Sequence, residues 1–163
     1  MLSQLDGRRK GQVVRFLFEA ELIKGNTPQL YLGGSIVGPA LEDDKIASRS
    51  DLTGVDLQHL FLIKLNLTRV YLESVNFRYS ILDEANFIGT NLGKADFTGA
   101  RLKGANLSFA NLKGAIFNNA NLRETKGLKQ KQLDEACGND KTLLPGKLSI
   151  TSCHADYQPH QPR

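Results

Sequence analysis

Hydrophobic residues recur at every fifth position through the middle of the chain. The row begins at Leu52 and ends at Leu122, and each of its fifteen positions holds Leu or Phe. On an α-helix a step of five residues turns the side chain by about 140°, so the row would scatter around the axis. On a straight strand, alternate members would point to opposite faces. The chain must therefore bend once in every five residues and wind into a coil.

The positions between these large residues follow the same period. The residue two places before each Leu or Phe is small or apolar, as at Val55 and Ala85, and the residue between the two is usually Asn or Asp. Because residues two apart on a strand share a face, each unit points in, out and in again before it turns. Glycine recurs at the turns, where an unusual φ is needed. The 50–124 segment has no proline, so every unit can donate hydrogen bonds to a neighbouring coil.

At residues 95–115 the sequence Ala-Asp-Phe-Thr-Gly-Ala-Arg-Leu-Lys-Gly-Ala-Asn-Leu-Ser-Phe-Ala-Asn-Leu-Lys-Gly-Ala resembles the pentapeptide-repeat family. The resemblance extends over residues 50–124. It implies a right-handed quadrilateral β-helix in which four units make a coil and residues twenty apart stack. We therefore expect an all-β solenoid of about four coils, in which Phe77, Phe97 and Phe117 share one interior column.

The segments before and after the repeat, 1–49 and 125–163, have other patterns. Residues 9–23 have apolar side chains at helical spacing, which predicts a helix that covers the first coil or binds a partner. Residues 29–49 fit either a degenerate first coil or, as we favour, a partly strand-like loop. This reading divides the chain into an N-terminal cap, the repeat and a C-terminal cap with a tail.

A second short helix is predicted over residues 129–136, where Leu133 and Ala136 could face the last coil and Gly138 would end the helix. The surrounding residues 127–145 resemble the segment that follows many pentapeptide repeats. We therefore expect the coil to be capped by an α-helix at each end. Because both open edges would then be covered, we expect the chain to be a monomer.

Charge and hydropathy exclude several kinds of partner. The net charge is +4, but Lys and Arg are dispersed along the chain, whereas a nucleic-acid-binding protein should have a clustered basic face. There is no apolar run of about 18 residues that could span a membrane. The N-terminus also lacks the apolar core of a signal peptide. We expect a cytoplasmic protein that binds neither nucleic acid nor membranes.

The chain has two cysteines, Cys137 and Cys153. In a reducing cytosol they are expected to be unpaired thiols. A metal site that combined them with His154 and His160 is conceivable, but the spacing matches no known pattern. We therefore expect no metal and no cofactor.

The sequence contains no recognisable catalytic arrangement. His59 is the one histidine in the repeat and falls at a turn, and the adjacent carboxylates Asp83 and Glu84 would diverge. The glycines follow the turns of the repeat and do not form a phosphate-binding loop. We expect no catalytic residues and no enzymatic activity.

A few apolar residues break the polar pattern of the outer surface. Phe61 and Ile81 are twenty apart and should stack on one face, with Ile63 and Tyr79 close to them. These four form a candidate partner patch, unless the N-terminal segment packs over it. The pattern favours a non-enzymatic protein-interaction or regulatory scaffold whose partner is another protein. The alternative, taken from one branch of the family, is a DNA-mimic inhibitor of topoisomerases such as gyrase, but that needs a strongly acidic face.

Overall fold

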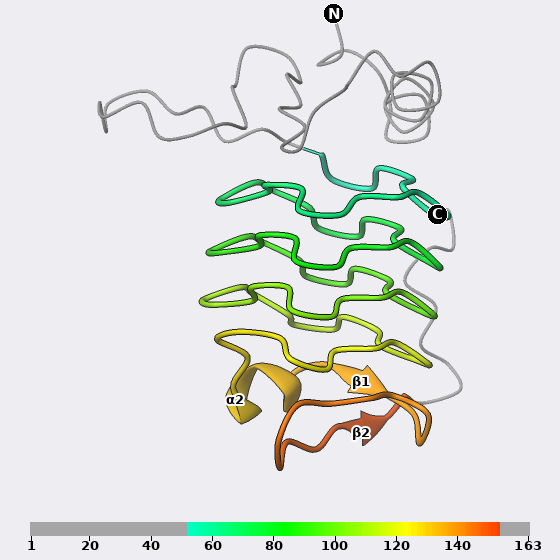
Figure 1. Cartoon of the computed structure of the whole chain (residues 1–163), viewed down its shortest axis with the longest axis vertical. Helices are drawn as coiled ribbons and strands as arrows, with labels where there is room; N and C mark the ends of the chain where they lie inside the picture. Colours follow the sequence, from blue (N-terminus) through cyan, green and yellow to red (C-terminus); the bar gives the residue numbers. More distant parts are fainter. Residues whose placement is uncertain (1–51, 154–163) are drawn as a thin grey trace, which may run out of the picture.

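The computed structural model describes residues 52–153. These residues form a stack of coils, with the C-terminal elements packed at one end of it (Figure 1). The predictions for residues 9–23 and 29–49 lie outside the described residues. The same holds for the helix expected to cap the first coil.

Parallel hydrogen bonding between residues twenty apart holds the coils together. Each isolated bridge from Asp56↔Asn76 to Asn106↔Lys126 has this spacing, which confirms that four units make one coil. The Leu57 N–H donates to Asn76 O at 2.8 Å, and the Asn76 N–H donates back to Val55 O at 2.9 Å. Each inner coil therefore bonds to the coils before and after it. The result is a four-sided β-helix, as the period of the sequence predicts.

The corners of the coil are tight turns with one left-handed residue. In the first turn Leu52 O accepts from the Val55 N–H at 3.1 Å, and Gly54 has a φ of +67°. This geometry fits a type II turn, whose third residue needs a positive φ. Glycine occupies that position in five of the fifteen turns, and a residue with a side chain occupies it in the other ten. The hydrogen bonds between coils on both sides of each turn therefore hold these ten residues in a left-handed conformation that residues with a side chain rarely adopt.

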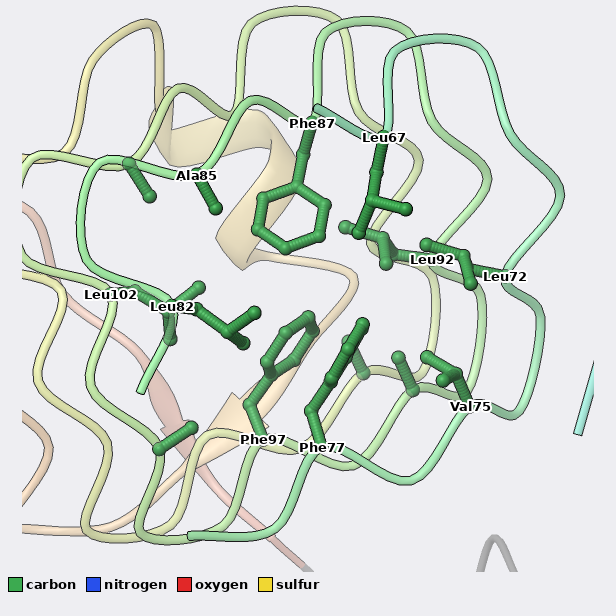
Figure 2. Close-up of a cluster of buried hydrophobic side chains, with 14 of the residues drawn as sticks. Leu67, Leu72, Val75, Phe77, Leu82, Ala85, Phe87, Leu92, Phe97 and Leu102 are labelled. Atoms are coloured by element: carbon green, nitrogen blue, oxygen red, sulfur yellow. The ribbon is translucent and has the colours of Figure 1, made fainter. Parts of the chain in front are cut away.

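The interior of the coil is filled by stacked aliphatic and aromatic side chains. The rings of Phe77 and Phe97 lie 5.3 Å apart, and those of Phe97 and Phe117 lie 5.0 Å apart, both stacked. Phe87 meets Phe77 and Phe97 edge-on from the other side of the coil (Figure 2). The predicted phenylalanine column is therefore confirmed, and Phe87 closes the space opposite it.

The C-terminal segment follows the last coil as a short helix and two very short strands. Helix α2 spans Gln130–Leu133, strand β1 spans Cys137–Gly138 and strand β2 spans Thr151–Ser152, with the two strands parallel. The predicted helix over residues 129–136 is therefore too long. It ends early because Cys137 must join the ladder beside Ile116. A helical cap at each end is thus not confirmed, although Leu133 and Ala136 are buried as expected.

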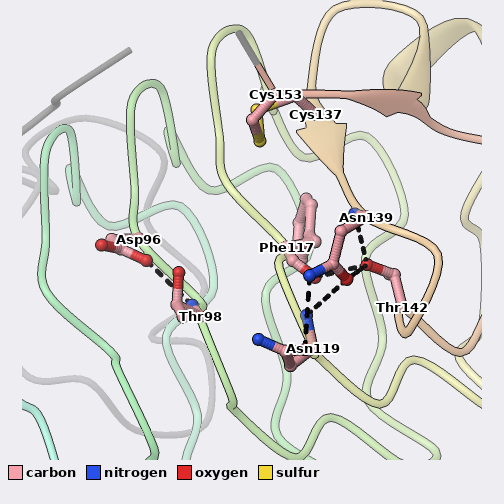
Figure 3. Close-up of a disulfide and its surroundings, with 8 residues drawn as sticks. All are labelled: Asp96, Thr98, Phe117, Asn119, Cys137, Asn139, Thr142 and Cys153. Carbon is pink, nitrogen blue, oxygen red and sulfur yellow. Dashed lines mark hydrogen bonds between the residues drawn. A yellow bond between two sulfur atoms is a disulfide. The ribbon is translucent and has the colours of Figure 1, made fainter. Parts of the chain in front are cut away.

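The prediction of unpaired thiols is wrong, because Cys137 and Cys153 form a disulfide (Figure 3). The pairing of β1 with β2 brings the two Cα atoms to 4.8 Å, within the usual reach of such a bond. Bonded to each other, the cysteines are not free to bind a metal. Within residues 52–153 there is no metal-binding group of three His, Cys, Asp or Glu side chains, and no helix there is long and apolar enough to cross a membrane. The cytoplasmic location stays a prediction.

Candidate partner-binding surface

The outward position of each unit, immediately before the buried Leu or Phe, has a structural function when it holds Asn or Asp. The Asn66 side-chain oxygen accepts from the Thr68 N–H at 3.1 Å, which satisfies a backbone donor at the start of the turn. The same bond is made by every Asn or Asp at an outward position of the described coils, namely Asp56, Asn66, Asn76, Asn86, Asn91, Asp96, Asn106, Asn111 and Asn121. The fold therefore favours Asn and Asp here.

Five outward positions of the described coils depart from this rule, and three of them follow one another on a single face. Phe61, Ile81 and Arg101 occupy successive coils of that face, and none of them can accept the turn N–H. The Lys103 N–H is bonded instead by the Asp83 carboxylate at 3.1 Å. The other two departures, Tyr71 and Ile116, lie on other faces. The fold alone does not explain the apolar residues Phe61 and Ile81.

Phe61, Ile63, Tyr79 and Ile81 together form what we call the apolar patch. Phe61 is 72% exposed, Tyr79 50% and Ile63 46%, whereas Ile81 is half-buried. Phe61 and Ile81 lie on adjacent rungs of the same face, as predicted, and Ile63 and Tyr79 border that face at its two corners. The structure thus places the four predicted residues in one region.

Tyr79 is held in place by its neighbours along one corner. Its ring stacks on His59 with centroids 5.2 Å apart, and the Arg78 guanidinium lies 5.8 Å from its centroid. On the other side, the ring lies so close to Gly99 that a Cβ there would collide with it. His59 is exposed at its turn, and its ring is also a stacking partner of Tyr79. The contacts with His59 and Gly99 therefore fix the position of the Tyr79 ring.

Ion pairs surround the apolar patch and neutralise its charged edge. Lys64 pairs with Glu84 at 3.6 Å, and Arg101 pairs with Asp83, which also holds the Lys103 N–H. On the opposite corner Arg78 pairs with the buried carboxylate of Asp96 at 3.2 Å. The exposed pairs contribute little stability. Because these charges are paired, the residues that surround the apolar patch carry no excess charge of either sign.

Phe109 is an exposed aromatic residue that the sequence interpretation missed. It is 83% exposed and has a φ of +59° at the left-handed position of its turn. Gln132 brackets this turn, since its amide donates to Leu107 O and to Ala110 O, each at 2.9 Å. The signal in the sequence is a Phe at a turn position that elsewhere holds glycine or a residue with a polar group. Phe109 lies at a different corner from the apolar patch.

The family model "Pentapeptide repeats" matches the chain in eight copies, over residues 50–87, 80–119 and 105–126. Residues 50–126 are therefore a pentapeptide-repeat region, and the right-handed quadrilateral β-helix of such repeats agrees with the four-sided ladder described above. No curated protein matches the chain.

Similar solved structures also carry this repeat. A pentapeptide repeat protein from the Arabidopsis thaliana thylakoid lumen is 30% identical, with 56% of this chain and 66% of that one covered and a TM-score of 0.47. Rfr23 from the cyanobacterium Cyanothece 51142 is 26% identical, with 68% and 67% covered and a TM-score of 0.48. HetL from Nostoc, involved in the regulation of heterocyst differentiation, is 33% identical, with 59% and 50% covered and a TM-score of 0.26.

Proposed function

We propose that this chain, with its pentapeptide-repeat region at residues 50–126, is a non-enzymatic scaffold that binds another protein through the apolar patch. The observation that carries the proposal is the replacement of Asn or Asp by Phe61 and Ile81 at outward positions. Each replacement removes a hydrogen bond that contributes about 1 kcal/mol to the stability of the fold. It also exposes apolar surface to water, which a protein without a partner tends to avoid.

The shape and the surroundings of the patch fit a protein partner. Aromatic side chains are enriched among the residues that contribute most to protein interfaces, and the patch has two, Phe61 and Tyr79. The buried neighbours Leu60 and Leu62 anchor the backbone on both sides of Phe61, so its position is fixed before binding. A neutral rim of ion pairs would exclude water around this centre without repelling a partner of either charge.

The test replaces Phe61 and Ile81 by asparagine, the residue that the repeat itself favours at their position. The Phe61→Asn, Ile81→Asn double variant is expected to unfold at the same denaturant concentration as the wild type or a higher one, because two turn hydrogen bonds are restored. The same variant should lose the bound partner in quantitative affinity capture from the native cell.

The matched control is Tyr71→Asn, which makes the same kind of change at an outward position of the opposite face. It is expected to leave partner capture unchanged. If the double variant and Tyr71→Asn retain the same partners in the same amounts, the apolar patch is not the binding surface. If the double variant loses stability, the patch is part of the fold and the argument from Phe61 and Ile81 fails.

The alternative of a DNA-mimic gyrase inhibitor requires a surface of uncompensated acidic charge. Residues 52–124 contain eight Lys and Arg and six carboxylates. Five of the six pair with Lys or Arg: Glu73, Asp83, Glu84, Asp96 and Glu124. This pairing weighs against mimicry of the DNA backbone. We expect no inhibition in a gyrase supercoiling assay at micromolar protein, and inhibition there would favour the alternative.

A further inference from the structure

We propose that the Cys137–Cys153 disulfide holds β2 against β1 at the C-terminal end of the coil, and that its reduction releases β2. While it is formed, β2 covers the outer edge of β1. When it is reduced, β2 leaves, and the edge of β1 that becomes free pairs with the same edge of a second copy of the chain. The inference concerns the end of the stack and does not rest on the apolar patch.

Strand β1 is the continuation of the ladder on one face of the coil. Cys137 bridges Ile116 in the parallel sense, as Ile116 bridges Asp96 one coil earlier. The Cys137 N–H donates to Ala115 O at 2.9 Å, and the Phe117 N–H donates to Cys137 O at 2.8 Å. One edge of β1 is thus bonded to the coil, and its other edge faces away from it.

A very short segment covers the outer edge of β1. Strand β2 has two residues, both exposed, and the Cys153 N–H donates to Gly138 O at 3.0 Å. The segment before β2 is held by the side chain of Ile150, which packs partly buried against the core. It is also held by Gln130, whose amide donates to Ser149 O and accepts from the Ser149 N–H, each at 3.0 Å. A strand this short depends on the covalent link to remain in place.

The disulfide can be reached by a small reductant. Both cysteines are half-buried, and the residues immediately before Cys153 are exposed. A thiolate of a dithiol attacks one sulfur, which forms a mixed disulfide and releases the other cysteine. The second thiol of the reductant then attacks that mixed disulfide and releases the remaining cysteine. Two electrons and two protons pass to the protein. Cys137 and Cys153 become thiols and the dithiol becomes a cyclic disulfide.

The second copy is the occupant that the geometry favours. An uncovered strand at the end of a ladder presents unpaired N–H and C=O groups and is a template for another strand. Two copies that meet through the same edge around a two-fold axis would pair β1 with β1 in the antiparallel sense, so one surface serves both chains. This pairing would extend the ladder that Ile116 and Cys137 already form.

The test compares the full chain before and after treatment with dithiothreitol by analytical ultracentrifugation. The oxidised chain is expected to sediment as a monomer and the reduced chain as a dimer. A reduced chain that stays monomeric at the highest concentration measured overturns the proposed pairing. The Cys137→Ser, Cys153→Ser double variant is expected to form dimers with or without dithiothreitol. If it is monomeric in both conditions, the pairing is likewise overturned.

A second measurement reports the release of β2 separately from dimer formation. Lys147 is exposed and lies in the segment that the disulfide closes, so trypsin cleavage after Lys147 reports opening of that segment. Cleavage at this bond in dilute protein is expected to be at least about tenfold faster after reduction. The cleavage rate is measured by mass spectrometry. An unchanged rate would show that β2 stays in place without the disulfide and would refute the proposed redox control of β2.

Discussion

Replacing Phe97 with alanine is expected to lower the free energy of unfolding by about 4 kcal/mol. The Phe97 side chain is fully buried, and its ring lies between those of Phe77 and Phe117, at 5.3 and 5.0 Å. Phe87 adds an edge-on contact at 6.1 Å. Alanine would remove three ring pairs at once, and each such pair contributes about 1 kcal/mol beyond the burial of its surface.

The cavity left by Phe97→Ala cannot close by bringing the coils together. The Phe97 N–H donates to Ile116 O and the Phe77 N–H to Asp96 O, both at 2.8 Å. These bonds hold the rungs at the ordinary spacing of a β-sheet. The neighbouring rings would therefore lose their contacts without finding new ones, which is the condition under which large-to-small substitutions cost most.

The measurement is chemical denaturation followed by far-UV circular dichroism, with Phe109→Ala as the matched control. Phe109 undergoes the same chemical change at a site that is 83% exposed, so its effect is expected to lie within about 0.5 kcal/mol. Phe97→Leu should be intermediate, because Leu57 occupies the same column one coil before Phe77. Equal losses for Phe97→Ala and Phe109→Ala would show that the ring column does not carry the stability of the coil.

The interior of the coil could be predicted from the sequence because covalent spacing determines it. Once every fifth residue is large and the chain turns between them, residues twenty apart must stack, and the column of Phe77, Phe97 and Phe117 follows. The polar outward positions were also predictable as a pattern. Their physical reason, a side-chain oxygen that accepts the N–H of the turn, became visible only with the hydrogen bonds, for example from Thr98 to Asp96.

The C-terminal elements could not be predicted in the same way because no period governs them. Strand β1 ends at Gly138 and β2 begins at Thr151, and the register between the two strands decides whether Cys153 lies next to Cys137. The sequence shows two cysteines and a helical pattern, but it does not show at which residues the chain pairs with β1 again. The predicted helix over 129–136 was too long for a related reason: pairing with Ile116 competes with the helix for the residues around Cys137.

The candidate site was predicted in part. The stacking of Phe61 and Ile81 follows from the period, and the structure confirms it. His59 and Tyr79 are also twenty apart and share the left-handed conformation of their turns, so the same period accounts for the stacking of their rings. The interpretation of the sequence considered the outward positions and not the turns, and it therefore missed Phe109 as well. Attention to turn positions, in addition to outward positions, would have found it.

Substituting Gly127 by alanine is expected to lower the free energy of unfolding by about 3 kcal/mol or more. Gly127 has a φ of +68°, which costs an alanine about 1–2 kcal/mol. An added Cβ would also collide with the Ser108 side chain and lie 2.8 Å from the Ser108 Cα. The hydroxyl of Ser108 could rotate away, but its backbone could not, because the Leu107 N–H is bonded to Lys126 O at 2.9 Å. The substitution therefore strains the junction between the last coil and α2.

Gly54→Ala is the matched control because it isolates the backbone conformation from the collision. Gly54 has a φ of +67°, and nothing lies within 4 Å of the position that its Cβ would take. The two substitutions restrict the unfolded chain equally, so that contribution cancels in the comparison. Gly54→Ala is expected to cost only about 1 kcal/mol, the strain of the left-handed turn. The difference between the two variants, measured by denaturant unfolding, then gives the energy of the contact with Ser108. If both variants lose the same stability, the close approach of Gly127 to Ser108 does not constrain the fold, and the C-terminal segment must be able to move away from the last coil.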